Sequence, residues 1–332
     1  MLKRLTTAGT SLLVLTACND TPVESLDVAP TAAARSAIDT VTRLAPLRRP
    51  YDINQRGQIV GQTLERRAGL WQDGTVTDLG ALAGDQTSLA QAINARGQIV
   101  GLSGSFGVGA RAFLWEDGEM TALGTLPGGT FSEANGINDR GQIVGSSDSA
   151  DGERAFLWEN GVMTDLGTLP GGYLSRAFDI NDRGQVVGFS TTAEGPPRAF
   201  LWEDGVMRDL GTPPGRFQSR ALAINNRGQV VGSSASFASQ EPFLWEDGVW
   251  TALSPLLDGD GVAVDINSRG QIVGDKGSLA LLWDDGVTID LTTVGRAYAI
   301  NARGQVVGVN GSGAVLVSVG RPGPSSGRRA IR

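Results

Sequence analysis

Three aspartates occupy the same place in three copies of a repeated phrase. Asp52, Asp179 and Asp265 each stand directly before an Ile-Asn pair. Carboxylates that converge on one space can divide acid and base roles between them, as hydrolases and lyases require. Aspartate also bonds readily to nearby backbone, so solvated or turn-capping side chains are the alternative interpretation. The three residues are therefore candidates to face a common channel.

The composition limits other catalytic chemistry. The chain of 332 residues contains no histidine and one cysteine, Cys18. A chain without histidine has no Ser-His-Asp triad and no imidazole metal ligand, and a single cysteine cannot form an internal disulfide. The acidic stretches 148–153 and 258–261 hint at calcium but do not match the spaced pattern of a calcium loop. We therefore predict no enzyme, no metal site and no cofactor.

Four residues are candidates for ligand binding because they lie where copies of the repeat differ. They are Tyr173, Arg176, Phe217 and Arg220. Loops that vary on a rigid scaffold are the usual place for binding. The net charge of −7 and a pI near 4.8 argue against nucleic acid, which needs a basic surface. The expected ligand is an extracellular or periplasmic protein or glycan of unknown identity, bound by a monomer.

The elements that position these residues come from a repeat. A nine-residue phrase, seen at Ile180 to Gly188, starts seven times, at Ile53, Ile93, Ile137, Ile180, Ile224, Ile266 and Ile300. A period of about 40 to 45 residues is typical of one supersecondary unit copied into a propeller or a solenoid.

One unit predicts four short strands. In the fourth copy they cover 176–180, 185–189, 199–203 and 206–210. Asn181 to Gly184 fits a type I turn, and Asp204-Gly205 is a strong hairpin signal. Bulky and small residues alternate along the first strand, which predicts that it lies innermost, where the blades converge. Four antiparallel strands per unit make one propeller blade.

Two further repeated residue types have structural and functional interpretations. Tryptophan precedes the hairpin turn at Trp71, Trp115, Trp158, Trp202, Trp245 and Trp283. We expect these rings to fill gaps between sheets, with carbohydrate stacking as the alternative. Each copy of the phrase also carries a turn arginine, which predicts a structural or solvated rim position rather than a cationic binding ring.

The chain ends predict how the ring closes. The last unit lacks its fourth strand, while 41–47 resembles the fourth-strand phrase at 163–169. The sequence therefore predicts an all-β, seven-bladed propeller of four-stranded antiparallel blades, closed by an N-terminal strand that completes the last blade. A β-solenoid is the rival, although it would need no complementary ends.

The N-terminus resembles a bacterial lipoprotein signal. Lys3 and Arg4 precede a short apolar run and then Leu15-Thr16-Ala17-Cys18. The run is too short to span a bilayer. The resemblance implies a signal peptide over 1–17, lipidation of Cys18, a lipid-anchored flexible tether over 18–38, the propeller over 39–319 and a disordered tail over 320–332. An ordinary secretory signal is the alternative.

The blade phrase is similar to the HAF repeat of probable extracellular bacterial proteins. Matching positions read Arg-Ala-Phe-Leu-Trp from Arg111, Arg154 and Arg198, and Leu-Gly-Thr-Leu-Pro-Gly-Gly occurs at 123–129 and 166–172. Arginine replaces the histidine that gives the repeat its name. The resemblance implies an exported repeat protein at the cell envelope or surface and supplies no catalytic residues. We expect a non-catalytic, membrane-tethered binding or scaffold module. The alternative is a propeller hydrolase or lyase that acts on extracellular glycans through the channel carboxylates.

Overall fold

The computed structural model describes residues 38–104, 109–253, 260–277 and 279–320, and these contain strands and turns without a helix. Internal contacts divide the chain into Met1–Thr31 and Ala32–Arg332, and every described residue belongs to the second unit. The predicted signal peptide, Cys18, the tether up to residue 37 and the tail from residue 321 lie outside the described residues. Within the described part, no helix is long and apolar enough to cross a membrane.

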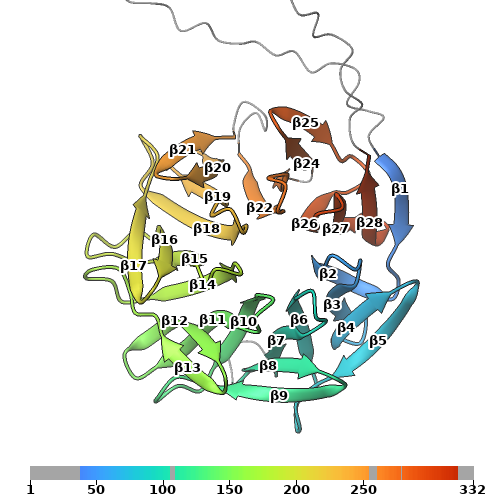
Figure 1. Cartoon of the computed structure of the whole chain (residues 1–332), viewed down its shortest axis with the longest axis horizontal. Coiled ribbons are helices and arrows are strands. Elements are labelled where there is room, and N and C mark those ends of the chain that lie inside the picture. Colours follow the sequence, from blue (N-terminus) through green and yellow to red (C-terminus); the bar gives the residue numbers. More distant parts are fainter. Residues whose placement is uncertain (1–37, 105–108, 254–259, 278, 321–332) are drawn as a thin grey trace, which may run out of the picture. The chain divides into compact units, whose positions relative to one another are not determined.

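The described chain forms seven four-stranded antiparallel sheets, or blades, arranged as a ring (Figure 1). The first strand of each blade, the A strand, lies innermost: β2 (Leu47–Ile53), β6 (Ser88–Ile93), β10 (Ser132–Ile137), β14 (Ser175–Ile180), β18 (Gln218–Ile224), β22 (Val262–Ile266) and β26 (Arg296–Ile300). The B strands follow: β3 (Ile59–Thr63), β7 (Ile99–Ser103), β11 (Ile143–Ser149), β15 (Val186–Ser190), β19 (Val230–Ala235), β23 (Ile272–Lys276) and β27 (Gln305–Asn310).

The outer half of each blade contains a C strand and a D strand. The C strands are β4 (Ala68–Gln72), β8 (Arg111–Glu116), β12 (Gly152–Glu159), β16 (Arg198–Glu203), β20 (Gln240–Glu246), β24 (Leu279–Asp284) and β28 (Gly313–Val319). The D strands are β5 (Thr75–Gly80), β9 (Glu119–Gly124), β13 (Val162–Asp165), β17 (Val206–Gly211), β21 (Val249–Ala252), β25 (Val287–Asp290) and β1 (Ile38–Arg43). Blades are numbered one to seven from β2 to β26.

The ring closes as the sequence predicts. β1 is the D strand of blade seven and pairs antiparallel with β28, with Val41 opposite Val317. Leu44, the first residue after β1, is fully buried, and its backbone N–H donates to the Ala314 carbonyl at 3.0 Å. The prediction of a seven-bladed propeller completed by an N-terminal strand is confirmed.

Every A strand carries a β-bulge, which the alternating pattern did not predict. The extra, unpaired residues are Tyr51, Gln91, Asn135, Phe178, Leu222, Val264 and Tyr298. A bulge re-aims the side chains of a strand, so strict alternation along the A strand was wrong. Bulged side chains of neighbouring blades touch: Gln91 donates to the Asn135 side chain at 2.9 Å.

The bulge explains the glycine of the repeated Val-Val-Gly phrase. A Cβ added to Gly188 in β15 would lie 1.9 Å from the backbone oxygen of Arg176 in β14. The equivalent glycines meet the same obstacle at 1.9 to 2.3 Å: Gly61, Gly101, Gly145, Gly232, Gly274 and Gly308. Only glycine fits this close approach of two strands.

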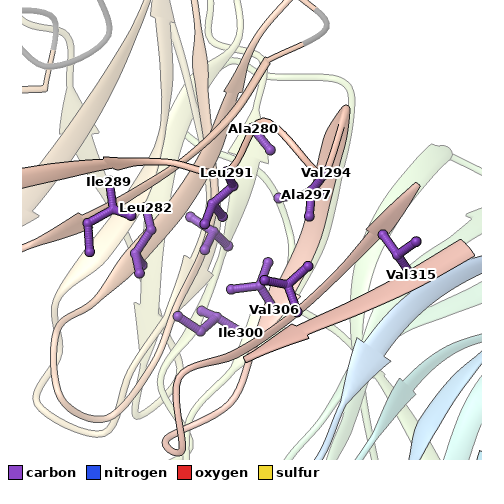
Figure 2. Packing of buried hydrophobic residues seen from close by; sticks show 11 residues of the cluster. Ala280, Leu282, Ile289, Leu291, Val294, Ala297, Ile300, Val306 and Val315 are labelled. Carbon is purple, nitrogen blue, oxygen red and sulfur yellow. The ribbon is translucent and has the colours of Figure 1, made fainter. Parts of the chain in front are cut away.

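The hydrophobic cores lie between neighbouring blades. Figure 2 shows one, in which Leu282 and Leu291 of blade six pack with Ile300, Val306 and Val315 of blade seven. The repeated tryptophans pack against such clusters, one at each: Trp71, Trp115, Trp158, Trp202, Trp245 and Trp283. Their role as spacers between sheets is confirmed.

Candidate functional site

Antiparallel connectivity gives the ring two faces. The A–B and C–D turns form one, here called the turn face, and the B–C and D–A loops form the other, the loop face. Val319, at the end of β28, donates its N–H to Gly304 in the last A–B turn at 3.1 Å, and Ile38 pairs with Val319. The strands that carry both ends of the described chain therefore meet at the turn face.

A circle of asparagines surrounds the axis on the turn face. The Asn181 side-chain oxygen accepts from the backbone N–H groups of Arg183 and Gln185 at 3.0 and 3.1 Å. Its amide nitrogen donates to the Gln185 side chain at 2.7 Å and to the Asn225 carbonyl of the next blade at 3.1 Å. The inter-blade bond recurs at every junction, from Asn54, Asn94, Asn138, Asn181, Asn225, Asn267 and Asn301. The last of these, from Asn301 to the Asn54 carbonyl, closes the circle.

On the same face, arginines of the A–B turns lie against the turn of the next blade. A Cβ added to Gly228 would lie 2.5 Å from the Arg183 guanidinium of the preceding blade. Five of the seven arginines cover the next turn glycine in this way: Arg56, Arg96, Arg183, Arg227 and Arg269. This arrangement agrees with the predicted structural turn position.

An axial cavity of about 210 Å³ opens among these turns. Isoleucine and asparagine side chains from the A–B turns line it together with Asp52, Asp139, Asp182 and Asp265. The four carboxyl groups make it a polar, acidic space.

The three predicted channel aspartates act as bridges between blades. Asp179 accepts from the backbone N–H of Ile180 at 2.8 Å and from Ile224 of the next blade at 2.8 Å. Asp52 and Asp265 make the same pair of bonds, at 2.7 and 2.8 Å and at 2.7 and 2.7 Å. The other four blades have a small residue here: Ala92, Gly136, Ala223 and Ala299. Asp52 and Asp265 contribute to the cavity wall.

Enclosure by protein alters the acidity of these aspartates. Burial raises the pKa of Asp52 to about 6, of Asp179 to about 7 and of Asp265 to about 8. Repulsion from Asp52 adds to the increase at the other two, while the backbone hydrogen bonds lower each pKa. A carboxyl group in this range can hold or release a proton near neutral pH. Both oxygens of each group, however, already accept a backbone hydrogen bond.

On the loop face, Arg176 joins blades three and four. Its Nε lies 2.6 Å from Glu153 Oε1, and the aligned hydrogen bond runs from Nη2 to Oε2 at 3.0 Å. Glu133 lies 3.9 Å away, and burial raises the pKa of this carboxyl despite the nearby guanidinium. Two acidic neighbours thus engage Arg176, which ties it to the scaffold more than its sequence position suggested.

Arg220 lies in a different environment. It is exposed, and its guanidinium carbon lies 4.8 Å from the centre of the Phe189 ring in blade four. No ion pair joins Arg220 to a carboxylate in the part of the chain that the structure describes. At the equivalent junction of blades six and seven, Arg296 pairs with Asp275 at 3.1 Å. Asp275 and Phe189 occupy the same strand position, directly after the glycine of the repeated phrase. Arg220 therefore has an aromatic ring where Arg296 has an acid.

Phe217 belongs to an aromatic pair whose second member the sequence reasoning missed. Phe237 stacks on it with ring centres 4.5 Å apart and planes 28° apart, and is 98% exposed. Two hydrogen bonds fix the loop that carries Phe237: Ser236 N–H to Ser239 O at 2.9 Å, and Ser239 N–H to Ser236 Oγ at 3.1 Å. The only signal in the sequence was one phenylalanine in a serine- and alanine-rich B–C loop.

Tyr173 is the fourth predicted ligand residue. It is 64% exposed in the D–A loop before blade four. Arg154 donates to its carbonyl at 2.6 Å, and its own N–H donates to Thr191 Oγ1 at 2.9 Å. These bonds hold the backbone and leave the ring accessible. Tyr173 precedes β14 and Phe217 precedes β18, so both lie on loops of adjacent blades.

Among the described residues, no group of three or more acidic, cysteine or histidine side chains could hold a metal ion. The acidic stretches noted in the sequence make backbone bonds instead. Asp148 accepts from the N–H groups of Thr130 and Phe131 at 2.7 and 2.6 Å, which lower its pKa. Asp260 accepts from Gln240 N–H at 2.7 Å, and 258–259 lie outside the described residues.

No family model and no curated protein sequence matches the chain. Solved structures do. A chain of the mitotic checkpoint complex gives a TM-score of 0.55 at 10% identity, over 90% of this chain and 99% of that one. YCF48 bound to D1 peptide gives 0.54 at 14% identity, over 84% and 96%. A puromycin-hydrolyzing peptidase of Mycobacterium tuberculosis gives 0.53 at 14% identity, over 84% and 51%. At these identities, what the chain shares with them is the propeller fold alone.

Proposed function

We propose that this chain is a non-catalytic, exported and membrane-tethered binding module of the HAF-repeat type, whose ligand docks on the loop face of blades four and five. One observation carries the proposal: Phe237 is 98% exposed on a hydrogen-bonded loop and stacks on Phe217. Holding a large apolar ring in water costs free energy that a ligand recovers when it covers the ring.

The placement of the chain ends suits a tethered receptor. Ile38 begins β1 at the turn face, so a tether from a lipidated Cys18 would reach the ring on the side opposite the loop face. The attachment point of the tether therefore lies away from the loop face. The lipoprotein-like N-terminus supports the anchor, and multiple acyl chains on one cysteine would make it durable.

Site-specific photo-crosslinking in intact bacteria tests the binding face. A photoreactive residue replaces Tyr173 on the loop face or, as the matched control, Val249 at the start of β21 on the turn face. The two side chains are 64% and 63% exposed. We expect adducts from position 173 and few from position 249. Equal adducts from both positions would refute a loop-face ligand site.

Labelling with a radioactive fatty acid tests the anchor. The wild-type chain should carry the label and sediment with membranes, whereas Cys18→Ser should lose the label and become soluble. A Cys18→Ser protein that stays in the membrane fraction would refute the tether.

The raised pKa values of Asp52, Asp179 and Asp265 favour a second candidate, a glycan hydrolase or lyase that uses a protonated axial carboxyl. Each carboxylate, however, accepts hydrogen bonds from the backbone of its own blade and of the next, which argues for a structural role. Turnover of reducing-end-labelled oligosaccharides that disappears in Asp265→Ala, which alters the cavity wall, with the fold intact, would establish the enzyme.

A further inference from the structure

Arg220 presents a positive charge that forms no ion pair with any carboxylate among the described residues. At the junction of blades six and seven, the equivalent Arg296 meets Asp275 of the preceding blade at 3.1 Å. At the junction of blades three and four, Arg176 meets Glu153 at 2.6 Å. At the junction of blades four and five, the preceding blade offers the Phe189 ring, 4.8 Å from the Arg220 guanidinium carbon. The ring orients the guanidinium by a cation–π contact without cancelling its charge.

An oriented guanidinium without an acidic partner fits a carboxylate from outside. Arginine binds carboxylates through two parallel N–H donors, and a guanidinium already held against a ring loses less side-chain entropy on binding. Arg220 is exposed, so its free edge can reach a ligand.

The aromatic pair lies on the same blade. Phe217 is three residues before Arg220, which at about 3.3 Å per residue separates their Cα atoms by roughly 10 Å. The Phe217 ring lies 4.5 Å from the Phe237 ring, centre to centre, and Phe237 is 98% exposed, so its ring is open to water. One open aromatic face matches the C–H-lined face of a sugar ring.

Polar residues neighbour Phe237 along the B–C loop and at its base. Ser236 and Ser239 flank Phe237, and Gln240 donates to Ser233 Oγ at 2.8 Å. A few fixed polar groups beside an aromatic surface give a ligand its orientation. Hydroxyl-rich surroundings fit a polyhydroxylated ligand better than an apolar peptide segment.

We infer that the loop face of blade five binds a saccharide that carries a carboxylate, with a sugar ring on Phe237 and the carboxylate on Arg220. This inference rests on the proposed function and adds the ligand class. It involves no covalent step.

Isothermal titration calorimetry of the purified protein with trigalacturonic acid tests the inference. The fully methyl-esterified trisaccharide removes the negative charge and keeps the ring. We expect wild type to bind the acid and to bind the ester at least about tenfold more weakly, which corresponds to about 1.4 kcal/mol. Arg220→Gln and Phe237→Ala should each weaken binding of the acid by about tenfold or more.

Arg296→Gln is the matched control, because Arg296 has the equivalent position and its own carboxylate partner. It should change the dissociation constant by less than about twofold. Phe189→Asp gives Arg220 the acidic partner that Arg296 has, and should abolish binding with Arg220 still present. Thermal unfolding of each variant establishes that it is folded.

Three results would overturn the inference: no binding of trigalacturonic acid, equal binding of the ester, or equal weakening by Arg296→Gln. Tighter binding of a hexaglutamate peptide than of the trisaccharide would overturn it in favour of an acidic protein partner. In any of these cases, crosslinks from position 173 but not 249 would still support the proposed function. Equal crosslinks from both positions would remove the proposed function as well.

Discussion

The two faces of the ring use their polar and apolar groups in opposite ways. On the turn face, Asn181 uses its side-chain oxygen and both amide hydrogens inside the protein, and the same set recurs at each blade. On the loop face, Phe237 is 98% exposed beside Phe217, and Arg220 lies over the Phe189 ring with no ion pair to a described carboxylate. The repeated residues therefore close the ring, whereas the proposed ligand site consists of residues that depart from the repeat.

Removal of β1, the strand that closes the ring, should have the largest effect on stability. Deletion of residues 1–43 leaves β28 as an unpaired edge and removes a whole D strand. We expect a loss on the order of 5 kcal/mol in the free energy of unfolding, which is a large part of a typical domain's stability. Deletion of residues 1–31 is the control and should leave the thermal midpoint unchanged. Equal midpoints for both deletions would contradict closure by β1.

A smaller change tests the contact between bulge and glycine. In Gly188→Ala, the new methyl would overlap the Arg176 carbonyl, and we expect destabilisation of roughly 3 kcal/mol or more in urea unfolding. Gly311→Ala is the matched control, because its Cβ would meet nothing within 4 Å, and it should stay within about 0.5 kcal/mol of wild type. Similar losses at both glycines would show that the bulge does not dictate the residue.

The axial aspartates make the stability of the ring depend on pH. Burial raises their folded pKa values to about 6, 7 and 8, above the 3.8 of a free aspartate. A carboxyl with a raised folded pKa favours the folded state when protonated. Its contribution is therefore complete below about pH 4 and is lost as pH rises through 6 to 8.

We expect the free energy of unfolding to fall by on the order of a few kcal/mol between pH 5 and pH 9. The triple variant Asp52→Ala, Asp179→Ala, Asp265→Ala restores the small residue of other blades and should flatten this dependence. Chemical denaturation across the pH range measures both. A wild-type curve that rises with pH would mean that the backbone hydrogen bonds outweigh burial.

Much of the fold could be predicted because each blade corresponds to one copy of the repeat in the sequence. The Asn-x-Arg-Gly and Asp-Gly turns mark the hairpins, and the resemblance of 41–47 to 163–169 locates the missing D strand. The bulge was not predictable, since one extra residue in a five- to seven-residue strand leaves the spacing of the repeat unchanged. The inter-blade role of Asp179 also escaped the sequence, because its partner Ile224 lies 45 residues away.

The candidate site was only partly predictable. The sequence made Tyr173 and Phe217 candidates because they lie in loops that differ between copies of the repeat. Sequence could not show that Arg176 meets an acid while Arg220 meets an aromatic ring, because the decisive residues, Glu153 and Phe189, belong to the preceding blades. Phe237 stayed unnoticed because its exposure depends on a loop conformation that two serines fix.

Urea unfolding of two single variants tests the division between the faces most directly. Asn181→Ala leaves the Asn225 carbonyl and two backbone N–H groups without their partner, and should cost about 2 to 4 kcal/mol. Phe237→Ala removes an exposed ring and should change the free energy of unfolding by less than about 0.5 kcal/mol. A loss at Phe237 as large as that at Asn181 would make the aromatic pair part of the scaffold and contradict a loop face kept free for a ligand.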